Sequence, residues 1–223
     1  MYGIIGELQI GGADMASVKQ RFFRGGIYHL YNRGNHREHV FRDNDDRKFF
    51  LSKVDEYCDR DRITVLAYCL MDNHFHLLLR QDGFAKVSAM MRSLMTSYVK
   101  RSNSKHGLVG RLFQGPYQSR WMNTDERLAF ASRYIHRNPA KFADIRTYRW
   151  SSYRQYLGAA PGMADPGPVL ALFESEGSYT MFVESGPTPE IGRRGAEYGQ
   201  WGDRVGSTGG KFFLVQSSGR IAG

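Results

Sequence analysis

The most informative stretch of the sequence is Cys69-Leu-Met-Asp-Asn-His-Phe-His-Leu-Leu-Leu-Arg80. Its apolar run is interrupted by Asp72-Asn73, a pair that favours a tight turn. The pattern predicts two antiparallel strands joined by that turn, over residues 63–70 and 74–80. Side chains at i and i+2 of a strand point to one face, so His74 and His76 stand side by side, about 7 Å apart along the backbone. Two imidazoles at that spacing can bind one divalent ion and leave positions open for oxygen ligands and substrate.

A pair of histidines one residue apart on a strand is more often a solvated or hydrogen-bonded surface pair than a metal site. Here, however, the pattern is histidine, large hydrophobe, histidine on a strand that leaves a tight turn. This arrangement and the surrounding residues 67–79 closely resemble the REP-associated tyrosine transposases, which are single-tyrosine HUH enzymes of the insertion-sequence-type transposase family. The resemblance covers about Phe22 to Tyr156, including Trp150-Ser-Ser-Tyr153, and it implies an enzyme that cuts and joins single-stranded DNA.

Periodicity and capping signals predict five further elements in the first 140 residues. Two strands are expected at 26–33 and 117–122, and helices at 43–59, 84–102 and from about 123 to Pro139. The order β-α-β-β-α-β-α predicts an α+β fold with a ferredoxin-like core, in which one antiparallel sheet carries helices packed mainly on one face.

The remaining segments suggest how the chain is divided. We expect a loose N-terminal arm at 1–20 and an HUH transposase-like catalytic domain at 21–157. A linker with a short helical segment should follow at 158–184, and a Gly-rich, mostly disordered tail at 185–223. No apolar run is long enough to span a membrane, and the first ten residues do not resemble a secretory signal. Cys58 and Cys69 are expected to be free, buried thiols in a reducing compartment. These features predict a cytoplasmic protein without a membrane partner, and the family resemblance implies that it is bacterial and nucleoid-associated.

The positive charge is concentrated in the middle of the chain. The net charge is +9, yet residues 19–154 carry 26 Lys and Arg against 13 Asp and Glu, and the segments on both sides are slightly acidic. This asymmetry favours a nucleic-acid partner, and cations interleaved with aromatics suit single-stranded or hairpin DNA. Each cation taken alone is more simply a solvated surface charge. The candidate DNA-contacting residues are Arg92, Lys100, Arg101, Arg111, Arg120, Arg133, Arg137 and Lys141.

The segment Arg133-Tyr-Ile-His-Arg-Asn-Pro139 carries the second match to the family. The resemblance implies that Tyr134 is the nucleophile and Asn138 the third metal ligand. The helical pattern agrees, because Tyr134 lies on the flank of the apolar stripe and Asn138 follows one turn later on the same side. A half-buried core aromatic remains the alternative for Tyr134. The other tyrosines considered lack an amide four residues further along a helix flank.

Three other histidines are candidate ligands by residue type. The spacing of His29, His36 and His39 gives no converging pair, so we expect surface or structural roles for them.

The expected mechanism is metal-assisted transesterification at a hairpin, REP-like sequence, with a covalent 5′-phosphotyrosine on Tyr134 and a free 3′-OH. The family implies Mg²⁺ or Mn²⁺, and mixed imidazole and amide ligands favour Mn²⁺. One alternative is a catalytically silent hairpin DNA- or RNA-binding protein on the same scaffold. A zinc hydrolase is a weaker alternative, because Asp72 falls in the turn and leaves no general-base carboxylate. Monomer and homodimer both remain open.

Overall fold

A four-stranded antiparallel sheet forms the centre of the computed structural model, which describes residues 21–185 of the 223-residue chain. The strand order is β2-β3-β1-β4. The strands are β1 (Ile27–Arg33), β2 (Ile63–Met71), β3 (His74–Gln81) and β4 (Gln118–Trp121). β2 and β3 form the predicted hairpin, which closes where Met71 pairs with His74.

Successive side chains of β3 pack into two different hydrophobic cores. Phe75 and Leu77 belong to the core on one face of the sheet, and Leu78 belongs to the core on the other face. A strand buried on both faces has a continuous apolar sequence instead of an alternating one. This explains the unbroken Leu77-Leu78-Leu79 run.

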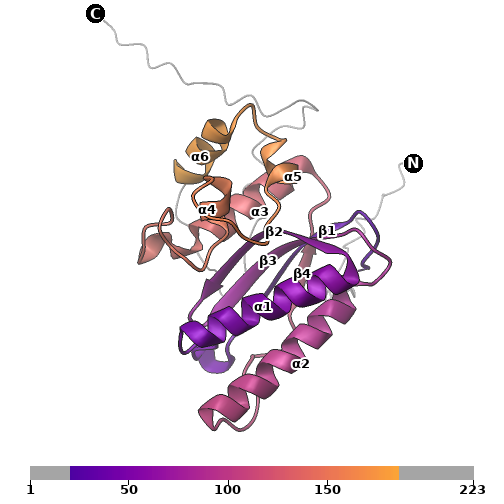
Figure 1. Cartoon of the computed structure of the whole chain (residues 1–223), viewed down its shortest axis with the longest axis vertical. Helices are drawn as coiled ribbons and strands as arrows, with labels where there is room; N and C mark the ends of the chain where they lie inside the picture. Colours follow the sequence, from indigo (N-terminus) through magenta and orange to yellow (C-terminus); the bar gives the residue numbers. More distant parts are fainter. Residues whose placement is uncertain (1–20, 186–223) are drawn as a thin grey trace, which may run out of the picture.

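Two long helices cover the first face (Figure 1). They are α1 (Asn44–Asp61) and α2 (Val87–His106). α1 begins where the Asp43 carboxylate accepts a hydrogen bond from the Asp46 backbone N–H at 2.9 Å. α2 ends at Gly107, whose φ of 61° is a left-handed conformation that glycine adopts without strain.

A second helical layer covers the opposite face (Figure 1). It contains α3 (Asp125–Arg137), α4 (Tyr153–Tyr156), α5 (Gly167–Leu170) and α6 (Glu176–Glu184). The Thr124 hydroxyl caps α3 by accepting from the Arg127 backbone N–H at 3.2 Å. After α3 the chain forms one 3₁₀ turn, η2 (Asn138–Lys141), because Pro139 cannot continue the helical hydrogen bonding. A further 3₁₀ turn, η1 (Asn35–Arg37), follows β1.

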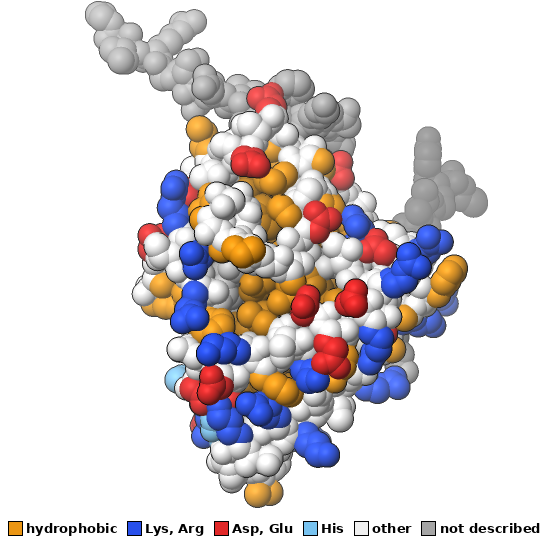
Figure 2. Space-filling model, viewed as in Figure 1, with side chains coloured by type: hydrophobic (Ala, Val, Ile, Leu, Met, Phe, Trp, Pro, Cys, Tyr) orange, Lys and Arg blue, Asp and Glu red, His pale blue; other side chains and the backbone are white. Residues whose placement is uncertain are grey.

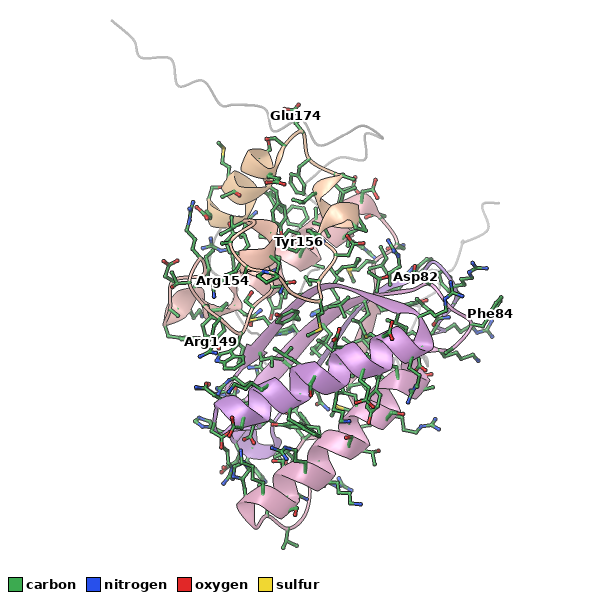
Figure 3. All side chains as sticks on the ribbon, viewed as in Figure 1. Asp82, Phe84, Arg149, Arg154, Tyr156 and Glu174 are labelled. Carbon is green, nitrogen blue, oxygen red and sulfur yellow. The ribbon has the colours of Figure 1, made fainter. Side chains whose placement is uncertain are left out.

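The α+β class, the antiparallel sheet and the predicted element order are confirmed. We expected the helices to pack mainly on one face of the sheet. Only α1 and α2 do so, whereas α3 to α6 build a second hydrophobic core on the other face. Tyr156, labelled in Figure 3, lies between the sheet and α5 and α6, and Tyr179 and Val183 are buried beside it.

The segment predicted as a linker packs on the sheet. The Asp165 backbone N–H donates to the Val65 carbonyl at 2.8 Å, and Val169 is fully buried. Residues 158–184 are therefore part of the same packed unit. The predicted arm at 1–20 and nearly all of the predicted tail lie outside the described residues.

The structure also bears on the expected free cysteines and on the expected lack of a membrane span. Cys58 and Cys69 are both buried and unpaired, as predicted. Within residues 21–185, no helix combines the length and the apolar character needed to cross a bilayer.

A buried histidine links the parts of the second layer. His136, on α3, has Nδ1 2.7 Å from the Tyr179 hydroxyl of α6 and Nε2 2.8 Å from the Ser152 hydroxyl. Burial lowers the pKa of His136 to about 3, so the ring is neutral at neutral pH.

We predict that His136→Phe lowers the midpoint of thermal unfolding. Losing the hydrogen bonds of a buried polar group costs about 1–3 kcal/mol, and each kcal/mol shifts a domain of this size by roughly 2–4 °C. The folded-state pKa lies below the unfolded value, so the unfolded state binds more protons between about pH 6.5 and 3. The stabilising contribution is therefore complete above pH 6.5 and declines as the pH falls.

Calorimetry at pH 7 and pH 5 should show a larger gap between wild type and His136→Phe at pH 7. His39→Ala, at an exposed position, is the control and should match wild type at both pH values. An equal gap at both pH values would contradict a neutral, hydrogen-bonded His136.

Candidate active site

Strand β3 presents two histidines to the face covered by α3. His74 and His76 are both buried, and their ring centroids are 5.1 Å apart with the planes inclined by 84°. The predicted common face is thus observed, and both rings turn toward α3.

The end of α3 brings two more predicted residues to this face. The Tyr134 ring centroid is 5.3 Å from that of His76, and the planes are perpendicular. Asn138 donates from Nδ2 to the Tyr134 carbonyl at 2.9 Å, one helical turn back. Its Oδ1 then lies 3.2 Å from His74 Nε2. The structure therefore brings together all four residues that the sequence singled out for catalysis and metal binding.

The His74 ring is held between two side-chain amide oxygens. Its Nδ1 is 2.6 Å from Asn73 Oδ1, and its Nε2 faces Asn138 Oδ1. Both amide nitrogens donate to backbone carbonyls, Asn73 to Arg37 and Asn138 to Tyr134, which orients the oxygens toward His74. A neutral imidazole has one N–H and can donate to only one of them. With Nδ1–H donating to Asn73, the His74 Nε2 lone pair and the Asn138 oxygen face one point, as two ligands of a cation do.

The second histidine supplies a buried nitrogen that needs a partner. His76 Nε2 has no hydrogen-bond partner in the described part of the chain. Leaving a buried polar atom unsatisfied costs about 1–3 kcal/mol. Burial lowers the pKa of His74 to about 4 and that of His76 well below its usual value, so both rings are neutral and able to bind a cation. Two neutral imidazoles and an amide oxygen fit a divalent ion of the Mn²⁺ type.

The electrostatics around Tyr134 include a nearby cation. Burial raises the pKa of the Tyr134 phenol to about 12, and the Arg33 guanidinium acts in the opposite direction. Arg33 is half-buried at the end of β1 and pairs with His74 across the sheet. Its side chain makes no ion pair or hydrogen bond with the residues that the structure describes. Tyr134 as a residue remains partly exposed.

One site residue was missed from the sequence. His29 is fully buried, and its Nε2 lies 3.0 Å from His76 Nδ1. The spacing of His29, His36 and His39 did not indicate this contact with His76, and of the surface and structural roles expected for His29 the structure shows a buried, structural one. By contrast, His36 and His39 are exposed, as expected.

The neighbours of His29 on β1 reach the same site. Tyr31 stacks on His29 with ring centroids 5.1 Å apart and lies 5.8 Å from the His76 ring. The strand period of two already places His29, Tyr31 and Arg33 on one face. The sequence did not reveal that β1 would lie beside β3.

Three predicted DNA-contacting residues line one groove. The groove has a volume of about 890 Å³ and lies between α2 and the segment that leads into β4. Arg92, Lys100 and Arg111 line it together with Tyr117, and no Asp or Glu does. Asn32, also in the lining, alternates with the site-facing residues of β1, so the groove opens on the α1/α2 face.

Three more of the predicted cations lie elsewhere on the surface. Arg101 packs over the Phe49 ring of α1, with its guanidinium carbon 4.5 Å from the ring centroid. Arg120 is half-buried in β4, opposite His29 in the sheet register. Lys141 is exposed at the end of η2.

The last two predicted cations pack against α6. Arg137 is buried and donates to the Val183 and Glu184 carbonyls at 2.8 Å, where it caps the C-terminal end of the helix. These contacts give the guanidinium a structural role in holding α6, and a DNA contact by Arg137 stays a prediction. Arg133 covers the Phe182 ring, with 4.8 Å between guanidinium carbon and centroid, and stays partly exposed.

A second cluster of potential ligands joins the start of α1 to the end of α2. It consists of Asp43, Asp46 and His106. Lys105 Nζ already lies 2.7 Å from Asp43 Oδ2 and 3.0 Å from Asp46 Oδ1. The ammonium occupies the place that a metal ion would take, so the cluster is a structural ion-pair network.

Comparisons with known proteins agree with this fold. The sequence model of the family described as "Transposase IS200 like" matches residues 23–138, just over half of the chain. A solved REP-associated tyrosine transposase bound to a REP hairpin is similar in fold, with a TM-score of 0.54 at 15% identity, covering 68% of this chain and 93% of that one. A putative transposase from Deinococcus radiodurans R1 is a weaker match, with a TM-score of 0.38 at 18% identity, covering 50% of this chain and 91% of that one. No curated protein matches the chain.

The chain belongs to the IS200-like transposase family. Its class is therefore that of a DNA-binding enzyme of transposition, as the sequence resemblance implied.

We predict that Mn²⁺ stabilises the folded protein through the His74, His76 and Asn138 cluster. A ligand at 100 times its Kd stabilises by about 2.7 kcal/mol, which corresponds to a rise of roughly 5–10 °C in the unfolding midpoint. His76→Ala should abolish the rise, because it removes a ligand. Asp43→Asn, in the second cluster, should keep it. The opposite result in a thermal-shift titration would place the ion at Asp43 and Asp46.

Proposed function

We propose that the protein is a metal-dependent single-strand DNA endonuclease and strand transferase that acts through a covalent 5′-phosphotyrosine on Tyr134. One observation carries the proposal: the Tyr134 ring lies 5.3 Å from that of His76, whose buried Nε2 has no partner among the described residues, and His74 Nε2 faces Asn138 Oδ1 at 3.2 Å on the same face. A phenol beside such a set of neutral donors has the parts that phosphodiester transfer needs.

In this proposal His74, His76 and Asn138 hold a Mg²⁺ or Mn²⁺ ion, which polarises the scissile phosphate when bound. The Tyr134 oxygen attacks phosphorus and forms the new P–O bond. The bond to the 3′ oxygen breaks, and the proton lost by the phenol ends on the released 3′-OH. Arg33 is placed to bind the phosphate, because its half-buried guanidinium lies near the phenol and lacks a protein partner among the described residues.

The other tyrosines support this choice of nucleophile. The Tyr98 hydroxyl donates to the Val40 carbonyl, and the Tyr153 hydroxyl donates to Glu184 at 2.9 Å. Both groups are engaged in the packed interior. Tyr31 is the strongest competitor, because it lies in the site, yet it has no helical amide beside it.

The charge distribution supports a single strand as substrate. α2 carries Arg92, Lys100, Arg101 and Lys105 and no acidic residue. Two of these, Arg92 and Lys100, line the groove together with Arg111. On the face seen in Figure 2, Lys and Arg alternate with Asp and Glu over α1, which makes that surface less attractive to a polyanion. Cations beside aromatic side chains suit unpaired nucleotides.

The proposed substrate carries a hairpin of the REP type. The solved relative with the similar fold is described as bound to a REP hairpin. A silent hairpin-binding protein is the second candidate, and the buried, unpartnered His76 Nε2 argues against it, because a binding module gains nothing from that cost. A zinc hydrolase fits less well, since Asp72 forms an ion pair with Arg47 and is not available as a base.

We predict that wild-type protein with a hairpin-bearing single strand and Mn²⁺ forms an adduct that survives denaturing electrophoresis. A label on the DNA 3′ of the nick should travel with the protein, because the tyrosine keeps the 5′ phosphate. Tyr134→Phe removes one oxygen and keeps the ring packing, so the adduct should vanish while DNA affinity persists.

Tyr31→Phe is the matched control in the same site, and it should still form the adduct. An adduct that survives in Tyr134→Phe and is lost in Tyr31→Phe would move the nucleophile to β1. Tight hairpin binding with no adduct in wild type would favour the silent binding protein.

We predict that the groove contributes two phosphate contacts through Arg92 and Arg111. For a single strand, each contact contributes roughly −0.7 to the slope of log K against log salt. The double variant Arg92→Met/Arg111→Met should therefore reduce the slope by about 1.4 in a fluorescence-anisotropy series. Lys48→Met, exposed on α1, should leave it unchanged. An unaltered slope in the double variant would exclude the groove from the binding surface.

A further inference from the structure

The buried contact between His29 and His76 joins two neighbouring strands. His29 lies on β1 and His76 on β3, and Tyr31 is the direct cross-strand partner of His76. The two imidazoles are therefore diagonal neighbours on one face of the sheet. His29 Nε2 lies 3.0 Å from His76 Nδ1, and the planes are inclined by only 24° with the centroids 5.1 Å apart.

One proton lies between these two nitrogens, and its position decides what His76 can bind. If His29 donates, His76 Nδ1 accepts, and a neutral His76 then carries its proton on Nε2. That N–H would be buried without an acceptor among the described residues and could not ligate a metal. If His76 donates from Nδ1, its Nε2 carries a lone pair directed into the site.

The neighbouring ligand shows the same arrangement. The Nδ1 of His74 faces the Asn73 oxygen at 2.6 Å, and its Nε2 faces Asn138. Metal-binding histidines commonly donate their second N–H to an acceptor that fixes tautomer and ring orientation. Asn73 fills this role for His74, and His29 is the group in the same place for His76.

The position of His29 is fixed by its surroundings. Its ring stacks on Tyr31 and lies 6.1 Å from the Tyr134 ring at an angle of 67°. β1 is an internal strand, hydrogen-bonded to β3 on one side and to β4 on the other. A buried ring held in this way can impose one geometry on its partner.

We infer that His29 is a positioning residue that accepts the Nδ1 proton of His76 and so keeps His76 Nε2 as a lone-pair donor for a divalent cation. The inference rests on the proposed function, in which His76 is a metal ligand. His29 does not touch the ion or the DNA in this role.

The test compares His29→Phe with His29→Gln in the full-length protein. Phe keeps the ring shape and removes the acceptor, whereas the Gln amide oxygen can take the place of Nε2. His136→Phe is the matched control, because it also removes a buried, hydrogen-bonded imidazole but lies outside the site. Two readouts are used: the Mn²⁺ Kd by electron paramagnetic resonance of free Mn²⁺, and the His76 tautomer by ¹⁵N NMR of histidine-labelled, metal-free protein.

The expected result is a His76 ring protonated on Nδ1 in wild type and on Nε2 in His29→Phe. The Mn²⁺ Kd should weaken by about 10–100-fold in His29→Phe, recover in large part in His29→Gln, and stay at the wild-type value in His136→Phe. Recovery by Gln separates positioning from a general loss of packing, which would affect both variants.

Two outcomes would overturn the inference. An unchanged Mn²⁺ Kd in folded His29→Phe, or a wild-type His76 protonated on Nε2, would refute it while the proposed function stood. Absence of Mn²⁺ binding by wild type would overturn the inference together with the metal step of the proposed function. The DNA-adduct assay then decides whether strand transfer survives without that step.

Discussion

Side chains of β3 alternate between two buried faces, and the candidate site depends on the register of that alternation. Phe75 and Leu77 fill the core under α1 and α2, while His74 and His76 face α3. A slip of one residue would exchange the two sets and bury the imidazoles among leucines. The turn before β3 prevents this: the Asp72 carbonyl accepts from Val40 and Phe41, and the Asn73 carbonyl accepts from Gly34. Backbone hydrogen bonds from residues more than 30 positions earlier in the chain therefore hold the turn and fix the strand register that the site requires.

Burying several polar side chains between a sheet and a helix is costly unless each atom has a partner. Most of these atoms do have one: His74 lies between two amide oxygens, Asn138 is tied to the Tyr134 carbonyl, and His29 meets His76. The remaining atom in this cluster is His76 Nε2. A buried nitrogen without a hydrogen-bond partner, in the same cluster as the His74 Nε2 and Asn138 Oδ1 pair, is better explained by a ligand than by folding stability. The same burial lowers the pKa of both imidazoles and keeps them neutral. The packing that leaves His76 Nε2 unsatisfied therefore also keeps the nitrogen lone pairs of His74 and His76 available to a cation.

The sequence could predict contacts between residues that are close together in the chain, but not contacts between residues that are far apart. His74 and His76 are two residues apart and Tyr134 and Asn138 four, so the strand and helix periods placed each pair on one face without any knowledge of packing. His29 could not be found in this way. It is 47 residues from His76, and only the pairing of β1 with β3 brings them together. The contact of Arg137 with α6 could not be found either, because Val183 is 46 residues away and only the packing of α6 against α3 brings the two together. The short apolar runs at 169–173 and 181–183 did not reveal that the segment 158–184 would complete the second core, because their partners on the sheet and on α3 are distant in sequence.

The groove lined by cations and the candidate catalytic cluster lie on opposite faces of the sheet. Cations gather around the groove on the α1/α2 face, where no acidic residue joins the lining, while the candidate catalytic cluster on the opposite face is built of buried neutral side chains, with Arg33 and Arg120 at its border. This separation is physically useful, because a dense group of unpaired cations beside His74 and His76 would repel a divalent ion. A single strand that contacts both places, as the proposed function requires, must pass around one edge of the sheet. β2 is covered by helices on both sides, whereas β4 is a four-residue edge strand with Gln118 and Trp121 exposed. Arg120 lies on that strand beside His29, at the point where the path would turn from the groove toward Tyr134. In the proposed function, the short edge strand β4, which the described residues leave partly exposed, is therefore where a single strand would pass between the two faces.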